Sequence, residues 1–121
     1  MHRHLIAILR GITTDEAAAV CDALLSAGIS QIEIPLNSPD PMCTIEMMVK
    51  QYGADARIGA GTVLTCADVD MLAEIGAHMV ISPNMNPEVI ARTKQLGLMS
   101  CPGILTPTEG FAALAAGADM L

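Results

Sequence analysis

The chain has 121 residues, of which 52% are hydrophobic, and a formal net charge of −7. This length fits one domain or part of one, and the apolar content argues against disorder. Only six Lys and Arg residues are present and they do not cluster, which argues against a nucleic-acid partner. No apolar run approaches the roughly 18 residues that span a membrane. The four scattered cysteines form no C-x-x-C pair, so we expect no metal site and a cytoplasmic protein with reduced thiols.

Short apolar runs alternate with segments of helical periodicity along the whole chain. The predicted strands are Leu5–Leu9, Gln31–Pro35, Arg57–Ala60, Met79–Ser82 and Met99–Cys101. The predicted helices are Thr14–Ala27, Pro39–Tyr52, Cys66–Ile75, Pro87–Leu96 and Pro107–Ala115. Before the first strand, His2 and His4 are interpreted as a terminal tail rather than a metal-binding pair.

Proline and glycine mark the ends of the predicted helices. Ser38-Pro39 and Asn86-Pro87 place proline at the first helical position. A glycine follows each helix, where a left-handed cap is expected; these are Gly28, Gly53, Gly76, Gly97 and Gly117. The pattern is a βα unit repeated five times, and Ala118–Leu121 looks like the beginning of a sixth strand.

Alternating strands and helices predict an α/β fold with a parallel sheet covered by helices. Two architectures compete, a doubly wound open sheet and a TIM (β/α)8 barrel. No G-x-G-x-x-G follows the first strand, which weakens the dinucleotide-binding version of the open sheet. Polar or special residues end every strand, as the active-site loops of a barrel require. We therefore predict that residues 1–121 form the N-terminal part of a single barrel domain, truncated within the sixth strand.

The most informative residue is Glu33, which lies between Ile32 and Ile34 in a predicted strand. Side chains alternate along a strand, so Glu33 faces away from the two isoleucines. Burial of a carboxylate shifts its pKa upward, and such groups are found where acid/base chemistry occurs. An acid at an exposed strand end is the alternative interpretation.

Other strand ends supply further candidates. Arg10 has a planar fork that holds a carboxylate or phosphate at two points, or it is the structural partner of Glu33. The turn Gly59–Thr62 allows close backbone approach to a ligand, with the Thr62 hydroxyl as a donor. Pro83 either ends its strand or forms a pocket wall.

At these residues the sequence resembles the 2-keto-3-deoxy-6-phosphogluconate/6-phosphogalactonate (KDPG/KDPGal) aldolase family. The matching motifs are Leu5–Gly11, Ile32–Pro39, Ile58–Leu64 and Cys101–Gly103, with Thr108-Glu109 after them, and they follow in order across essentially the whole chain. The resemblance is closest to the phosphogalactonate branch, because the phosphogluconate enzymes typically carry an arginine where Asn37 stands.

The resemblance implies a class I aldolase without metal or other cofactor, usually a homotrimer, that acts in galactonate degradation. It cleaves a phosphorylated keto-deoxy sugar acid, 2-dehydro-3-deoxy-6-phosphogalactonate, into pyruvate and glyceraldehyde 3-phosphate. A lysine amine forms a Schiff base that serves as the electron sink. By motif, Glu33 is the general acid/base, Arg10 binds the substrate, Thr62 holds the pyruvate end and Pro83 forms part of the pocket wall.

One departure from the family is serious. The family's Schiff-base lysine follows the stretch that matches Gly117–Leu121, so none is present in this chain. Its lysines, Lys50 and Lys94, lie on predicted helices and are expected to be solvated. The chain is therefore expected to be an inactive portion of the aldolase. The alternatives are another phosphosugar-binding barrel, such as an epimerase that uses Glu33, and a non-catalytic half-barrel that associates with itself.

Overall fold

The structure is a computed structural model that describes residues 3–121, so His2 of the predicted tail lies outside the described residues. The strands are β1 (Ile6–Ile8), β2 (Gln31–Pro35), β3 (Arg57–Gly61), β4 (Met79–Ser82) and β5 (Met99–Pro102). The helices are α1 (Thr14–Ser26), α2 (Pro41–Tyr52), α3 (Cys66–Glu74), α4 (Pro87–Gln95) and α5 (Pro107–Ala115). The predicted alternation of strands and helices is confirmed.

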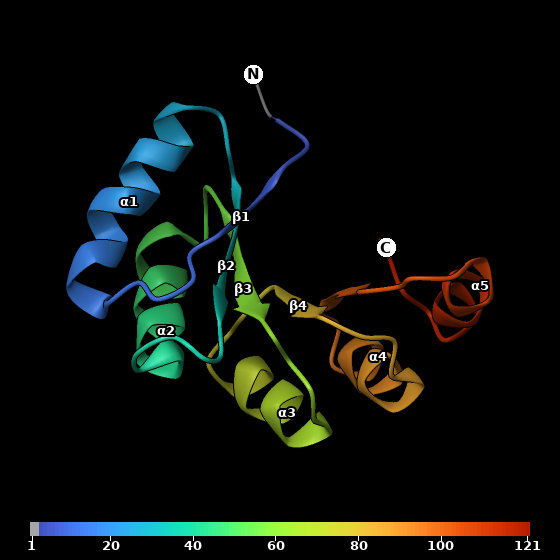
Figure 1. Ribbon diagram of the computed structural model, residues 1–121. Coiled ribbons are helices and arrows are strands. Elements are labelled where there is room, and N and C mark those ends of the chain that lie inside the picture. The colour runs from blue at the N-terminus through green and yellow to red at the C-terminus, as the bar shows by residue number, and fades with distance from the viewer. Residues whose placement is uncertain (1–2) are drawn as a thin grey trace.

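The five strands form one parallel sheet in the order β1-β2-β3-β4-β5. Figure 1 shows the helices in an arc along one side of the curved sheet, while the opposite, concave side opens between the two chain ends. A doubly wound sheet reverses its strand order and carries helices on both faces. The consecutive order and the single helical layer are instead those of the TIM-barrel class, as predicted.

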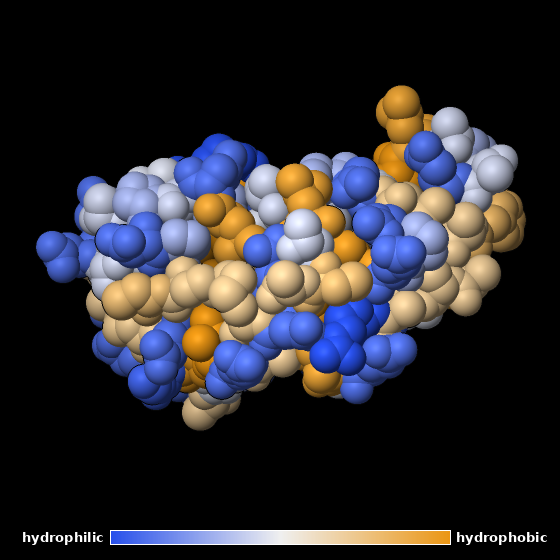
Figure 2. Space-filling model, turned by 90° about the horizontal axis from the view of Figure 1, so that it is seen from below, coloured by the Kyte–Doolittle hydropathy of each residue, from blue (hydrophilic) through white to orange (hydrophobic). Residues whose placement is uncertain are grey.

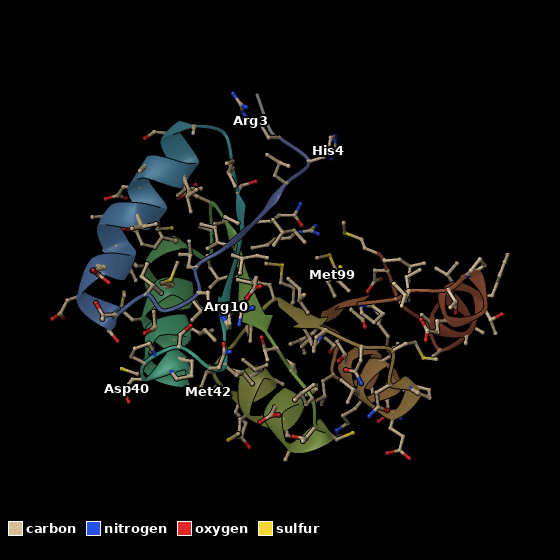
Figure 3. The ribbon with its side chains drawn as sticks, in the orientation of Figure 1. Arg3, His4, Arg10, Asp40, Met42 and Met99 are labelled. Carbon is tan, nitrogen blue, oxygen red and sulfur yellow. The ribbon has the colours of Figure 1, made fainter. Side chains whose placement is uncertain are left out.

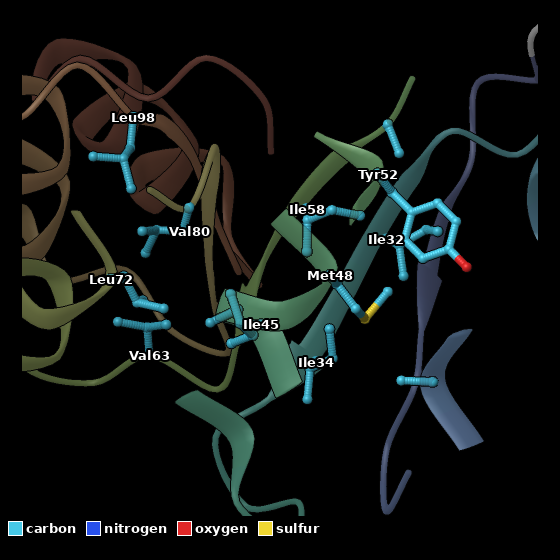
Figure 4. Packing of buried hydrophobic residues seen from close by; sticks show 14 of the residues in the cluster. Ile32, Ile34, Ile45, Met48, Tyr52, Ile58, Val63, Leu72, Val80 and Leu98 are labelled. Atoms are coloured by element: carbon cyan, nitrogen blue, oxygen red, sulfur yellow. The ribbon is translucent and has the colours of Figure 1, made fainter. Parts of the chain in front are cut away.

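The hydrophobic core lies between the sheet and the helices (Figure 4). Ile32 and Ile34 of β2 and Ile58 of β3 are fully buried there, together with Met48 of α2. Each buried side chain of this size contributes roughly 1.5–3 kcal/mol to folding. The core therefore fixes which side of β2 faces the helices, and with it the direction of the residue between Ile32 and Ile34.

The predicted start of α2 and the predicted conformation of its C-terminal cap are wrong, whereas its predicted end at Tyr52 is confirmed. Helix α2 begins at Pro41 rather than Pro39, and its N-cap Asp40 has a left-handed backbone with φ of 41°. Both prolines satisfy the rule for a first helical position, so the local pattern does not choose between them. Gly53 has φ of −61°, not the left-handed cap predicted. The chain there continues into a turn in which the backbone N–H groups of Asp55 and Ala56 donate to the Tyr52 carbonyl.

The last residues run beside β5 without forming a regular strand. The backbone N–H groups of Asp119 and Met120 both donate to the Ser100 carbonyl, at 2.9 and 3.3 Å. The Asp119 carboxylate accepts from the Ser100 N–H and from the Lys94 ammonium, both at 2.7 Å. Lys94 is therefore partnered and half-buried, contrary to the predicted solvated side chain, whereas Lys50 is 73% exposed beside Glu46.

Apolar side chains remain exposed at the α5 end of the molecule. Phe111 is 76% exposed and Leu105 92% exposed. In Figure 2, strongly hydrophobic atoms stand out at the end of the molecule where α5 lies, and a band of weakly hydrophobic residues crosses the otherwise hydrophilic helical face. Contiguous apolar surface is typical of interaction sites. Within residues 3–121, no helix is both long and apolar enough to cross a bilayer.

Candidate active site

Glu33 lies on the face of the sheet opposite the helices. Its neighbours Ile32 and Ile34 pack into the core, so strand alternation turns the carboxylate toward the concave side. The side chain is nevertheless only 2% exposed. On the adjacent strands, Ile8 of β1 and Gly59 of β3 are its register partners, and its carboxylate lies against Gly61 of β3.

Gly61, at the end of β3, provides the space that the Glu33 carboxylate occupies. A Cβ atom at residue 61 would overlap both carboxylate oxygens of Glu33. The sequence predicted close backbone approach at Gly59–Thr62, but to a ligand. In the structure the group that approaches Gly61 is a protein carboxylate from the neighbouring strand. This role of Gly61 was missed, because it depends on the register between β2 and β3.

The environment of Glu33 favours its protonated form. Burial raises the pKa of Glu33 to about 7, although the positive charge of Arg10 and a hydrogen bond from the Gly61 backbone act to lower it. Among residues 3–121, the Glu33 Oε2 atom is the buried side-chain polar atom that has no hydrogen-bond partner. A buried oxygen left unpaired costs roughly 1–3 kcal/mol, so such an atom is typical of a functional group. The carboxyl group can therefore both give and accept a proton near neutral pH.

Arg10 lies beside Glu33 and makes a hydrogen bond to another residue. Its Nη1 atom donates to the Asn37 Oδ1 atom at 3.0 Å, and no ion pair joins it to Glu33 in the described part of the chain. The guanidinium is exposed, with donors free to bind an anion. Of the two predicted roles, the direct structural pair with Glu33 is thus not formed, while substrate binding stays a prediction.

A second contact joins the same two loops. The Gly11 backbone N–H donates to the Ser38 hydroxyl oxygen at 3.0 Å, and Ser38 is buried. The sequence predicted Ser38 only as the residue before a helix start and did not predict this bond, because its partner lies 27 residues away and no local motif signals it.

Thr62 and Pro83 lie at the ends of the next two strands. Thr62 follows Gly61, is half-buried and has a left-handed backbone with φ of 57°. Backbone strain at a non-glycine residue is concentrated at functional sites. Pro83 is exposed after β4, and its carbonyl lies so close to Gly103 that a Cβ there would overlap it. The structure places both residues at the same edge of the sheet as Arg10 and Glu33, and their binding roles stay predictions.

A cavity of about 910 Å³ lies at the other end of the strands. It is lined by residues at strand starts, including Gln31, Arg57 and Met99, and by Arg3 and His4. Figure 3 shows Arg3 and His4 near the N-terminus, whereas Arg10 lies toward the start of α2, where Asp40 and Met42 are labelled. In barrel enzymes the chemistry takes place at the C-terminal ends of the strands. We therefore assign the candidate site to the Glu33 end, where the carboxyl with a raised pKa lies.

Comparison with known proteins identifies relatives of this chain. The family profile described as "KDPG and KHG aldolase" matches residues 1–121. The chain is 52% identical over 121 residues to a probable 2-dehydro-3-deoxy-6-phosphogalactonate aldolase of Rhizobium meliloti. It is 51% identical over 117 residues to the 2-dehydro-3-deoxy-6-phosphogalactonate aldolase of Escherichia coli. These alignments cover 100% and 97% of this chain, which spans 57% of the length of each relative.

Solved structures show the same fold. A native KDPGal structure superposes with a TM-score of 0.93 at 47% identity, over 99% of this chain and 61% of that one. The KDPG aldolase of Legionella pneumophila, with pyruvate captured as a covalent carbinolamine, gives a TM-score of 0.84 at 25% identity. This superposition covers 94% of this chain and 55% of that one. A protein cage designed by fusing symmetric oligomeric domains gives a TM-score of 0.92 at 50% identity. This superposition covers 95% of this chain and 43% of the cage chain. With a matching profile over its whole length, the chain belongs to the KDPG and KHG aldolase family.

Proposed function

We propose that the protein that carries this chain is a class I aldolase that cleaves 2-dehydro-3-deoxy-6-phosphogalactonate into pyruvate and glyceraldehyde 3-phosphate. The observation that carries the proposal is the buried Glu33 carboxyl, whose pKa is raised to about 7 beside an exposed guanidinium. Two relatives that bear the name of phosphogalactonate aldolases, at 51% and 52% identity, support this choice of substrate.

Glu33 supplies the proton transfers in the proposed reaction. When an amine adds to the keto carbon, the carbonyl oxygen must gain protons and leave as water. When the carbon–carbon bond breaks, the substrate hydroxyl must lose its proton. A carboxyl that is partly protonated near neutral pH performs both tasks. Arg10 binds the substrate carboxylate through its fork, Thr62 holds the pyruvate end, and Pro83 forms part of the pocket wall.

The imine-forming amine in the proposed reaction belongs to a lysine other than Lys50 and Lys94. Lys50 pairs with Glu46 on the outer surface of α2, at 2.7 Å. Lys94 donates to Asp119 and to the Leu98 carbonyl, and it lines the cavity at the far end of the strands. The relative that holds pyruvate as a carbinolamine, which is the addition product of an amine and a carbonyl, supports covalent chemistry of this kind.

We also propose that residues 1–121 are the N-terminal part of one barrel domain, in a cytoplasmic homotrimer that acts in galactonate degradation. The 57% coverage of the relatives and the exposed apolar residues of α5 support further units that pack against this one. The cage built from symmetric oligomeric domains supports self-association. Light scattering of the purified protein measures the assembly, and a monomer would contradict it.

Borohydride reduction in the presence of pyruvate tests the proposed chemistry. We expect mass spectrometry to find a covalent pyruvate adduct on a lysine of the protein that carries this chain. A cleavage assay with the two C4-epimeric substrates should give the higher kcat/KM for the phosphogalactonate. An active enzyme without the adduct would contradict the Schiff-base mechanism. A preference for the phosphogluconate would contradict the assigned substrate.

A further inference from the structure

Two hydrogen bonds join adjacent residues of the first two strand-end loops. Arg10 and Gly11 follow β1, and Asn37 and Ser38 follow β2. The Arg10 guanidinium donates to the Asn37 side-chain oxygen, and the Gly11 N–H donates to the Ser38 hydroxyl, both at 3.0 Å. The pairs lie side by side and connect residues 27 positions apart.

The β2 side of this connection is the more firmly held. Ser38 is buried, and its backbone N–H donates to the Pro35 carbonyl of β2 at 2.9 Å. The turn that carries Asn37 is thereby fixed to the strand that carries Glu33. Arg10 has instead a long exposed side chain, whose free rotamers represent roughly 2 kcal/mol of entropy. Asn37, which is also exposed, thus offers an acceptor on a turn whose backbone is fixed, to a side chain that would otherwise be mobile.

We propose that Asn37 is a positioning residue that holds the Arg10 guanidinium beside Glu33, in the orientation that binds the substrate carboxylate. This inference rests on the proposed function. Asn37 acts through Arg10 and does not itself handle the reacting atoms. A guanidinium that is already ordered loses less entropy when it binds a carboxylate, so the contact improves substrate binding.

The same contact affects the proton equilibrium of Glu33. Arg10 is the charged group that lowers the pKa of Glu33 against the effect of burial. From β3 the carboxylate meets Gly61, which carries no charge, and on β1 its register partner is the apolar Ile8. If the guanidinium moves away, the pKa of Glu33 rises further above 7 and less of the carboxylate is present at neutral pH.

The test is a double-mutant cycle in the protein that carries this chain. Asn37→Leu removes the acceptor at similar volume. We expect a roughly 10- to 100-fold loss in kcat/KM, mostly through a higher KM, because a misplaced binding group costs affinity. The Glu33 titration midpoint, followed by carboxyl ¹³C NMR, should move upward. In an Arg10→Ala background, Asn37→Leu should change neither quantity further, since its effect passes through the guanidinium.

Ser38→Ala is the matched control, because it breaks the neighbouring hydrogen bond and leaves the Arg10–Asn37 contact in place. We expect a loss of thermal stability without a shift in the Glu33 midpoint. An Asn37→Leu variant with the parent KM and midpoint would overturn the positioning role, as would an equal effect in the Arg10→Ala background. If the parent protein forms no pyruvate adduct, the proposed function fails, and the titration midpoints in the same variants still decide the role of Asn37.

Discussion

The two ends of the parallel sheet hold their polar residues in different ways. At the start of the strands, the Asp119 carboxylate accepts from Lys94 and from the Ser100 backbone, and His78 accepts the Ile58 N–H at 3.0 Å. At the C-terminal ends, Glu33 keeps an oxygen without a partner in the described residues, and Arg10 is exposed.

This difference indicates that the polar groups at the strand starts contribute to folding stability, whereas those at the C-terminal ends contribute to catalysis. Paired groups at the strand starts lower the free energy of the folded state. The incompletely paired Glu33 carboxyl at the C-terminal ends raises the free energy of the folded state. Its pKa is raised from 4.5 to about 7. In barrel enzymes the same division assigns function to the C-terminal ends of the strands. Substitutions at the strand starts should therefore change stability alone, whereas substitutions at the C-terminal ends should also change turnover.

The largest expected effect is that of Glu33→Gln on turnover. Glutamine keeps the shape but cannot transfer a proton, so we expect kcat to fall by roughly 10²–10⁴ in the protein that carries this chain. Steady-state kinetics measure the change. Glu46→Gln, which alters an exposed acid on the outer face of α2, is the control and should leave kcat as it was. An unchanged rate in Glu33→Gln would refute the proton-transfer role.

The second effect is a dependence of stability on pH that is specific to Glu33. Its pKa is raised from 4.5 to about 7 in the folded state, so the folded state binds more protons than the unfolded state between these values. The stabilisation is complete below about pH 4.5 and is lost as the pH rises through 7. The shift corresponds to about 3 kcal/mol. Urea unfolding from pH 4 to 8 should show this decline in the parent and not in Glu33→Gln.

The third effect tests the space beside the carboxylate. Gly61→Ala forces the Glu33 side chain or strand β3 to move, so we expect a loss of about 1–3 kcal/mol in the free energy of unfolding and at least roughly a tenfold loss of turnover. Gly97→Ala is the control, since Gly97 has φ of 76° with no neighbour near its missing Cβ. It should cost about 1 kcal/mol through backbone strain, with turnover retained. Equal turnover in both variants would argue against the steric role.

The smallest effect is expected at the other end of the sheet. Burial acts to raise the pKa of Asp119, but the hydrogen bonds from Lys94 and Ser100 lower it overall. Both partners of the ion pair are about one-third exposed, so screening limits its contribution. We expect Lys94→Met to cost about 1 kcal/mol in thermal or urea unfolding and to leave kcat and KM unchanged. A kinetic defect with normal stability would contradict the division between the two ends.

Local patterns predicted most of the fold. Alternation of Ile32, Glu33 and Ile34 placed the carboxyl on the correct face, because burial of the isoleucines decides the orientation. The first turn of α2 was misplaced, since Pro39 and Pro41 satisfy the same local rule. Contacts between distant residues were not predictable from a local pattern. The partner of Lys94 is 25 residues away, and the proximity of Gly61 to Glu33 follows from strand register.

The surface against which Glu33 rests is main chain, because Gly61 contributes no side chain there. A side chain in this position could adopt another rotamer or be replaced by a residue of different polarity. A backbone that is hydrogen-bonded within a sheet can do neither. The strength of this acid is consequently set by side chains through Arg10, which follows β1, and through its partner Asn37, which follows β2.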